Sequence, residues 1–287
     1  MEINLSKYAG FCDGVKRAYN MVDSLDLEKA RRPVFILGSL VHNDEVNKKV
    51  EEKGIKKIGR EQLFNAKLGE IGTLIITAHG SGPDVYEIAG VKGIEIFDTT
   101  CPKVTKVQGL AKVYASRGHK IIIVGDEGHK EVRGINEWGD GNALIISKEK
   151  DLKSINYKTD DRIAVLAQTT QNEDFFLRAG EGIREKYPNA EIINTTCSAT
   201  HERQEEAREM AKNNDAMIII GSVVSANSKR LFEISKSINP LSYFIEKAAD
   251  LKREWFSGIS KTGVTAGASA PHWIIEDVIS SLKKMAL

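Results

Sequence analysis

Cysteine is scarce in this chain, with three in 287 residues. An odd number of cysteines cannot all pair within one chain. Widely spaced thiols in a reducing compartment are also more often ligands or core residues than disulfides. The count therefore argues against a small fold held together by disulfide bonds.

A charge of one sign and a long apolar run are also missing. The 41 basic and 40 acidic residues leave a net charge of +1, which gives no electrostatic basis for binding nucleic acid or an anionic membrane. No apolar run approaches the ~18–20 residues that span a bilayer, and no apolar segment follows a basic start as in a signal peptide. We expect a cytoplasmic protein with neither a nucleic-acid nor a membrane partner.

Strands and helices are predicted to alternate along the whole chain, and its six prolines form no linker. Such alternation is typical of α/β layers built on largely parallel sheets. Helices are predicted to begin near Asp13 and at Ser198 or Thr200, and a last helix is predicted over 274–285. The polar stretch 149–161 is predicted to be an exposed connection between strands.

The three cysteines occupy equivalent places in three degenerate repeats. Each is followed by a helical pattern and then by an apolar strand that ends in glycine, at Gly38, Gly125 or Gly221. A repeat of roughly 100 residues indicates like units that pack around a pseudo-symmetry axis. The three predicted α/β units are residues 1–97, 98–193 and 194–287, the last with the C-terminal helix.

Each cysteine, Cys12, Cys101 or Cys197, precedes a predicted helix. Free N–H groups and the helix dipole favour the thiolate there, which is the form that binds metal. One such cysteine is more often a small buried residue, but three in register indicate a three-thiolate site with an open coordination position. Zinc usually has a short two-ligand knuckle, which is missing. A [4Fe–4S] cluster with one open iron fits the wide spacing.

Polar residues recur at three positions of the repeat, each near the end of a predicted strand. They are His42, His129 and Ser225, then Asp44, Glu131 and Asn227, and then His79, Thr169 and Ser269. Ligands of parallel sheets bind at the carboxyl ends of the strands, so these residues should face the same cavity as the cysteines. Imidazole, hydroxyl and amide donors without lysine or arginine in register suit an anion such as a phosphate.

Glu131 is the carboxylate that stands out among these donors. Beside a bound anion its pKa should rise, because like charges disfavour ionisation, and a protonated carboxylic acid can act as a general acid. A surface glutamate at the start of a helix is an equally good interpretation of its spacing. Asp44 has the equivalent position, and we interpret it as an N-terminal helix residue.

Nine short segments, in order from Ala9 to Pro271, carry the three cysteines and all of these polar residues except Asp44. They are residues 9–18, 40–43, 78–80, 100–102, 128–132, 168–170, 195–200, 225–228 and 266–271. Together they resemble the 4-hydroxy-3-methylbut-2-enyl diphosphate reductase family, and the resemblance spans nearly the whole chain.

The resemblance implies a trefoil of three α/β units around a central cavity, with a [4Fe–4S] cluster on Cys12, Cys101 and Cys197. It implies reductive removal of an allylic hydroxyl from (E)-4-hydroxy-3-methylbut-2-enyl diphosphate, with the fourth iron open to the substrate. The products would be isopentenyl and dimethylallyl diphosphate, the last step of the methylerythritol phosphate route to isoprenoids. Electrons would come singly from a ferredoxin or a flavodoxin.

The same resemblance implies a role for each polar position. Glu131 matches the proton donor, Thr169 the residue that positions the hydroxyl and Glu131, and His129 a diphosphate-side or proton-relay residue. The residues that match positions holding the diphosphate are His42, His79, Ser225, Asn227 and Ser269. Two positions depart from the family pattern: Ala226 replaces a second serine beside the diphosphate, and Gln108 replaces a histidine on a helix that we expect to lie away from the site.

Three other classes of protein remain open from the residues alone. A cluster-dependent dehydratase or synthase, similar to quinolinate synthase, would use the open iron without needing external electrons. A non-catalytic iron–sulfur redox sensor should present a basic recognition helix or a strongly charged face, and the balanced charge suggests neither. A structural zinc protein is the third alternative.

Overall fold

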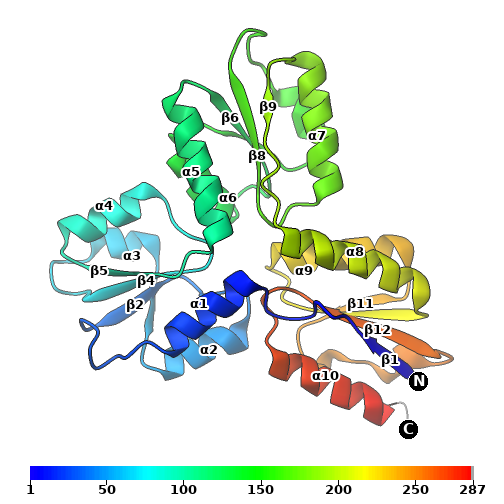
Figure 1. The fold of residues 1–287 in the computed structure, drawn as a ribbon. Helices are drawn as coiled ribbons and strands as arrows, with labels where there is room; N and C mark the ends of the chain where they lie inside the picture. The colour runs from blue at the N-terminus through cyan, green and yellow to red at the C-terminus, as the bar shows by residue number, and fades with distance from the viewer. Residues whose placement is uncertain (286–287) are drawn as a thin grey trace. The chain divides into compact units, whose positions relative to one another are not determined.

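The structure is a computed structural model that describes residues 1–285. It is an α/β protein with three four-stranded sheets in which all paired strands are parallel (Figure 1). The chain divides into two compact units. Unit 1 consists of Met1–Val15, His42–Asp44 and Cys197–Leu287, and unit 2 consists of Lys16–Val41 and Glu45–Thr196. The last two residues, 286 and 287, which end the third predicted unit, lie outside the described part.

The first sheet of unit 2 has the strand order β3-β2-β4-β5. One of its two central strands, β4, has the sequence TLII and is buried at every position, as expected where helices cover both faces of a parallel sheet. Its strands are β2 (Val34–Leu37), β3 (Lys56–Ile58), β4 (Thr73–Ile76) and β5 (Glu95–Asp98). Helices α1 (Asp13–Asp23), α2 (Asp44–Glu52), α3 (Arg60–Asn65) and α4 (Pro83–Val91) accompany this sheet along the chain.

The second sheet of unit 2 has the strand order β7-β6-β8-β9. Successive residues of β6 pack on opposite faces: Ile122 lies in the core with Phe176 of α7, whereas Ile121 lies in the core with Val107 of α5 and Ile135 of α6. Its strands are β6 (Lys120–Val124), β7 (Leu144–Ile146), β8 (Ile163–Ala167) and β9 (Glu191–Ile192). Its helices are α5 (Pro102–Ser116), α6 (Lys130–Trp138), η1 (Glu149–Ser154) and α7 (Glu173–Lys186).

Unit 1 contains the third sheet, in the order β1-β12-β10-β11. In β10, Ile218 packs in the core that includes Val278 of α10, and Ile219 packs in the core that includes Ala207 of α8 and Leu231 of α9. The strands are β1 (Glu2–Leu5), β10 (Ala216–Ile220), β11 (Ser242–Ile245) and β12 (Lys261–Ala266). The helices are α8 (Ser198–Asn213), α9 (Ala226–Ile238), η2 (Ala248–Asp250), η3 (Arg253–Phe256) and α10 (His272–Met285).

The structure confirms the predicted class of three similar parallel α/β sheets and the starts of the helices at Asp13 and Ser198. Two features differ from the expectation. The polar stretch 149–161 is only partly exposed, because Ile155 is buried in the core of the second sheet. The N-terminal strand β1 pairs with β12 of the third sheet, although it precedes the first sheet along the chain. The predicted unit boundaries stay predictions.

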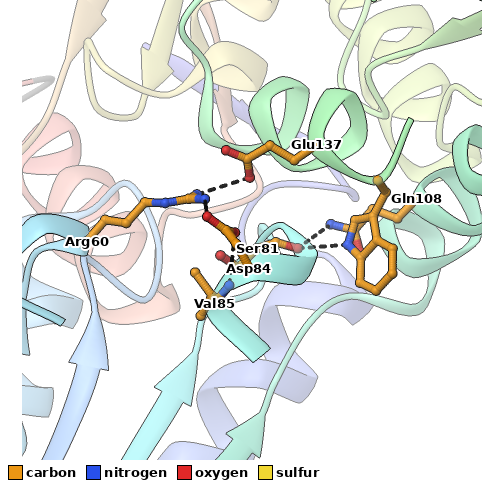
Figure 2. Close-up of polar contacts among 7 residues, drawn as sticks. Arg60, Ser81, Asp84, Val85, Gln108 and Glu137 are labelled. Carbon is orange, nitrogen blue, oxygen red and sulfur yellow. Dashed lines mark hydrogen bonds and ion pairs between the residues drawn. The ribbon is translucent and has the colours of Figure 1, made fainter. Parts of the chain in front are cut away.

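Polar contacts join the two sheets of unit 2 (Figure 2). Arg60, on α3, pairs with Asp84 at the start of α4 and with Glu137 of α6, the latter at 3.0 Å. The indole Nε1 of Trp138 donates to the carbonyl oxygen of Ser81 at 2.9 Å. These contacts fasten the loop before α4 to α6.

Within the described residues, no helix has the length and apolar character needed to cross a membrane.

Candidate functional site

Two of the three cysteines follow the same local turn. The Asp98 carboxylate oxygen Oδ1 accepts a hydrogen bond from the Thr100 backbone N–H at 2.8 Å, and the Asn194 oxygen Oδ1 accepts from the Thr196 N–H at 3.0 Å. Aspartate and asparagine form such turns because their short side chains reach the backbone two residues on. The sequence repeat is therefore also a repeat of local structure.

The three cysteines form no disulfide bond and are half-buried. Cys101 and Cys197 are the N-cap residues of α5 and α8, and Cys12 directly precedes α1. Free backbone N–H groups and the positive end of the helix dipole favour negative charge on sulfur at such positions. Three cysteine thiols at helix starts, none of them in a disulfide bond, are a donor set that suits a thiolate-ligated metal cluster.

The glycines that end the first strand of each repeat are structurally equivalent. Each donates its N–H to the last residue of the neighbouring strand: Gly38 to Ile58 at 2.9 Å, Gly125 to Ile146 at 3.0 Å and Gly221 to Ile245 at 2.9 Å. The polar residues that follow therefore leave the carboxyl edge of each sheet in the same way, which is where parallel sheets bind ligands.

Unit 2 contains Cys101, His79, His129, Glu131 and Thr169 of the predicted site. His129 is the N-cap of α6, and its ring Nδ1 accepts from the Glu131 N–H at 3.2 Å. A neutral ring that accepts at Nδ1 carries its hydrogen on Nε2. The His79 and His129 rings lie edge to face with centroids 5.6 Å apart.

Glu131 is buried, with 2% of its surface exposed. Its oxygen Oε1 accepts from the Thr169 N–H at 2.6 Å, and Oε2 accepts from the Thr169 hydroxyl at 2.9 Å. Burial, together with a smaller effect of the Asp126 charge, raises the pKa of Glu131 to about 7, although the Thr169 hydrogen bonds act to lower it. The alternative interpretation of Glu131 as a surface glutamate is therefore wrong.

Unit 1 contains Cys12, Cys197, His42, Ser225, Asn227 and Ser269. The Ser269 hydroxyl donates to the His42 carbonyl oxygen at 3.2 Å, and Ser225 is the N-cap of α9, where it accepts from the Ser228 N–H at 3.3 Å. Asn227 is 4% exposed, and neither its side-chain oxygen nor its nitrogen has a hydrogen-bond partner among residues 1–285. Buried amides without partners are costly, so this one is available to a ligand.

Basic side chains near the strand ends of unit 2 escaped the sequence analysis, because they are not in register between the repeats. A cavity of about 210 Å³ there is lined in part by Arg60, Lys130 and Arg133. Burial lowers the pKa of Lys130, and the charges of Lys57 and Arg133 lower it further. Two of these side chains, Lys130 and Arg133, lie on α6 just after His129, whereas Arg60 is paired with Glu137, which also lines the cavity.

Gln108 lies nearer to the strand ends than expected. It is 5% exposed, and its Nε2 donates to the Ser81 carbonyl oxygen at 3.5 Å (Figure 2). A side chain at Gly80, directly after His79, would meet that same nitrogen. Ser228 was given no role either, although it lies in the segment 225–228: it is fully buried against Gly221 and Gly267.

The fold and the strand-end residues define a parallel α/β protein with thiol, imidazole and carboxyl groups at the carboxyl edges of repeated sheets. Comparison with known proteins identifies the family within this class. The family model described as LytB protein matches residues 3–283, and the chain belongs to this family.

Curated relatives match over the full chain length. The 4-hydroxy-3-methylbut-2-enyl diphosphate reductase of Alkaliphilus oremlandii is 37% identical over 286 residues, which cover 99% of this chain and 100% of the relative. The enzyme of the same name from Aquifex aeolicus is 36% identical, and the alignment covers 99% of this chain and 97% of that enzyme.

Solved structures are similar as well. The E-1-hydroxy-2-methyl-but-2-enyl-4-diphosphate reductase from Plasmodium falciparum aligns with a TM-score of 0.90 at 29% identity, over 98% of this chain and 88% of that one. A structure of (E)-4-hydroxy-3-methyl-but-2-enyl diphosphate reductase, described as the terminal enzyme of the non-mevalonate pathway, aligns with a TM-score of 0.69 at 35% identity, over 99% and 100%.

Proposed function

We propose that this protein reduces (E)-4-hydroxy-3-methylbut-2-enyl diphosphate to isopentenyl and dimethylallyl diphosphate, the last step of the methylerythritol phosphate pathway. Full-length similarity to reductases of that name supports the proposal. The single structural observation that carries it is the buried Glu131 carboxyl, whose pKa of about 7 makes it a proton donor near neutral pH.

The reaction removes a hydroxyl group and requires two electrons and two protons, with water as the second product. Hydroxide is a poor leaving group, so the oxygen must be protonated as its carbon bond breaks. Glu131 supplies that proton from its carboxyl group. Thr169 holds both carboxyl oxygens of Glu131, and its hydroxyl orients the hydroxyl group of the substrate.

We assign a [4Fe–4S] cluster to Cys12, Cys101 and Cys197, because three thiols at helix starts that form no disulfide fit it as ligands. The cluster, when bound, supplies single electrons and a Lewis-acidic iron that lacks a protein ligand. A ferredoxin or a flavodoxin is the electron donor in this proposal.

The diphosphate of the substrate is assigned to His42, His79, Ser225, Asn227 and Ser269, with His129 on the same side as a diphosphate or proton-relay residue. The unpartnered amide of Asn227 supports this assignment, because a diphosphate oxygen accepts from its nitrogen. The basic side chains of Lys130 and Arg133, which line the cavity of unit 2, favour the approach of a polyanionic substrate.

The test begins with anaerobic purification, visible absorption, and counts of iron and sulfide. The hydroxylated diphosphate is then added with a reduced one-electron donor, and the two C5 diphosphates are measured. Release of both products from a brown protein is the expected result. A brown protein that forms neither product would instead indicate a non-redox dehydratase or a sensor, and a colourless protein that cannot be reconstituted would refute the cluster.

A further inference from the structure

Arg203 is a buried arginine that ties two cysteine segments of unit 1 together. It lies on α8, six residues after Cys197, and has 5% of its surface exposed. Its Nη2 donates to the Gly10 carbonyl oxygen at 2.9 Å, and its Nη1 donates to the Ala199 carbonyl oxygen at 2.8 Å. Gly10 is two residues before Cys12, and Ala199 is two residues after Cys197.

The charge of Arg203 has no counter-charge in direct contact. Its two hydrogen-bond acceptors are neutral carbonyls, its Nε has no partner, and no ion pair to it exists within the described chain. Glu206, one turn along α8, has its carboxylate bound to Ser6 and to the N–H groups of Lys7 and Tyr8. A buried charge without an opposite partner is costly, so the site should contain an anion that these residues do not supply.

We propose that Arg203 is a positioning residue for the cysteine site: its guanidinium holds the segment that leads into Cys12 and supplies the positive charge that balances a cluster bound by thiolates. This inference rests on the proposed iron–sulfur function. Each electron added to the cluster adds negative charge, so a fixed positive charge nearby favours the reduced state.

Arg17 offers a weaker version of the same arrangement in unit 2. It lies on α1, five residues after Cys12, and its Nη1 donates to the Thr100 carbonyl oxygen at 3.2 Å, next to Cys101. Unlike Arg203 it is exposed, so its charge is screened by water. Substitution of Arg203 is therefore the stronger test of whether a nearby positive charge balances the cluster.

The experiment compares the cluster midpoint potential, measured by an anaerobic redox titration followed by electron paramagnetic resonance, in four variants. Arg203→Lys keeps the charge, whereas Arg203→Met and Arg203→Gln remove it. Arg208→Met is the matched control, because Arg208 lies on the same helix and pairs with Glu205. Iron and sulfide are counted in each, and circular dichroism checks folding.

We expect the two neutral variants to disfavour reduction by at least tenfold, which is about 59 mV toward more negative potential for one electron. The Lys variant and the Arg208 control should stay within about threefold of the wild type, roughly half that shift. A second result would equally support the inference: both neutral variants lose the cluster, the Lys variant retains it, and all three variants are folded.

Two results would overturn it. If the midpoint potential is unchanged in the neutral variants, the charge of Arg203 does not influence the cluster. If the Lys variant behaves like the neutral ones, Arg203 acts through its shape and hydrogen bonds and not through its charge. In both cases the wild type still holds a cluster, so the proposed function survives. A wild type that binds no cluster at all would refute the proposed function itself and this inference with it.

Discussion

Glu131 combines a burial that disfavours its charged form with two hydrogen bonds from Thr169 that favour it. Burial has the larger effect, because a carboxylate that leaves water loses more than two hydrogen bonds return. With the resulting pKa of about 7, the carboxyl group can donate a proton at neutral pH and can then be reprotonated.

Replacing this carboxyl should test its role directly. Glu131→Gln keeps the shape and one acceptor oxygen but has no acidic proton, so turnover should fall by about 10²- to 10⁴-fold, while the iron content stays normal. The control is Glu127→Gln, an exposed glutamate just before α6. Near-normal turnover in the Glu131 variant would refute the acid role.

The raised pKa also has a consequence for stability. Protonated Glu131 is favoured in the folded state, so its contribution is fully present below the ordinary value of 4.5 and is lost as the pH rises through about 7. Between pH 5 and pH 8 the wild type should lose part of a total on the order of 3 kcal/mol. Denaturant unfolding should give a flatter profile for Glu131→Gln, and parallel profiles would contradict the assignment.

Asn227 is the residue whose unmet hydrogen bonds most directly suggest a ligand contact. Asn227→Ala should raise KM about ten- to a hundredfold, because hydrogen bonds to charged groups contribute about 1.5–3 kcal/mol. Steady-state kinetics against the exposed control Asn213→Ala would measure this. An unchanged KM would argue against a diphosphate contact at this amide.

At the scale of elements, the strand-end glycines make room for the helix that follows. Ser228 on α9 is fully buried between Gly221 and Gly267, and a side chain at either glycine would overlap it. The N-terminus of α9, with Ser225 and Asn227, therefore lies directly against the ends of β10 and β12.

Adding one methyl group should disturb this packing. Gly221→Ala should destabilise the protein by about 1–3 kcal/mol, as overpacking does in well-packed cores. Gly90→Ala is the control, because Gly90 lies in α4 with no atom within 4 Å of the added carbon, and it should stabilise the fold by about 0.5–1 kcal/mol. Urea unfolding measures both variants. Equal unfolding midpoints for the two would show that Ser228 can move aside at little energetic cost.

The helices and the strand-end turns were predictable from the sequence, because their signals are local. Asp98 and Asn194 cap the turns before two cysteines, and Cys197 lies at the start of α8. The pairing of β1 with β12 was not predictable. The two strands lie about 260 residues apart, and no local sequence signal identifies which distant strand will pair with which.

At the scale of the whole molecule, the three cysteines are predicted to act as one set. Replacing Cys12, Cys101 or Cys197 by serine removes a thiolate, and we expect each of the three variants to lose stable cluster binding. Iron and sulfide analysis after anaerobic reconstitution would show this. A variant that keeps full iron and activity would exclude that cysteine from the site.

The sequence by itself determined the class of fold, the threefold repeat, and which residues follow the strand ends, because period, caps and glycines act within a few residues of the chain. Only the tertiary structure decided which of those residues are buried. It distinguished Glu131 from a surface glutamate, left the Asn227 amide without a partner, and enclosed Arg203 without a counter-charge. Burial depends on elements distant in the chain, and it is burial that changes the pKa of a carboxyl and the energetic cost of a charge.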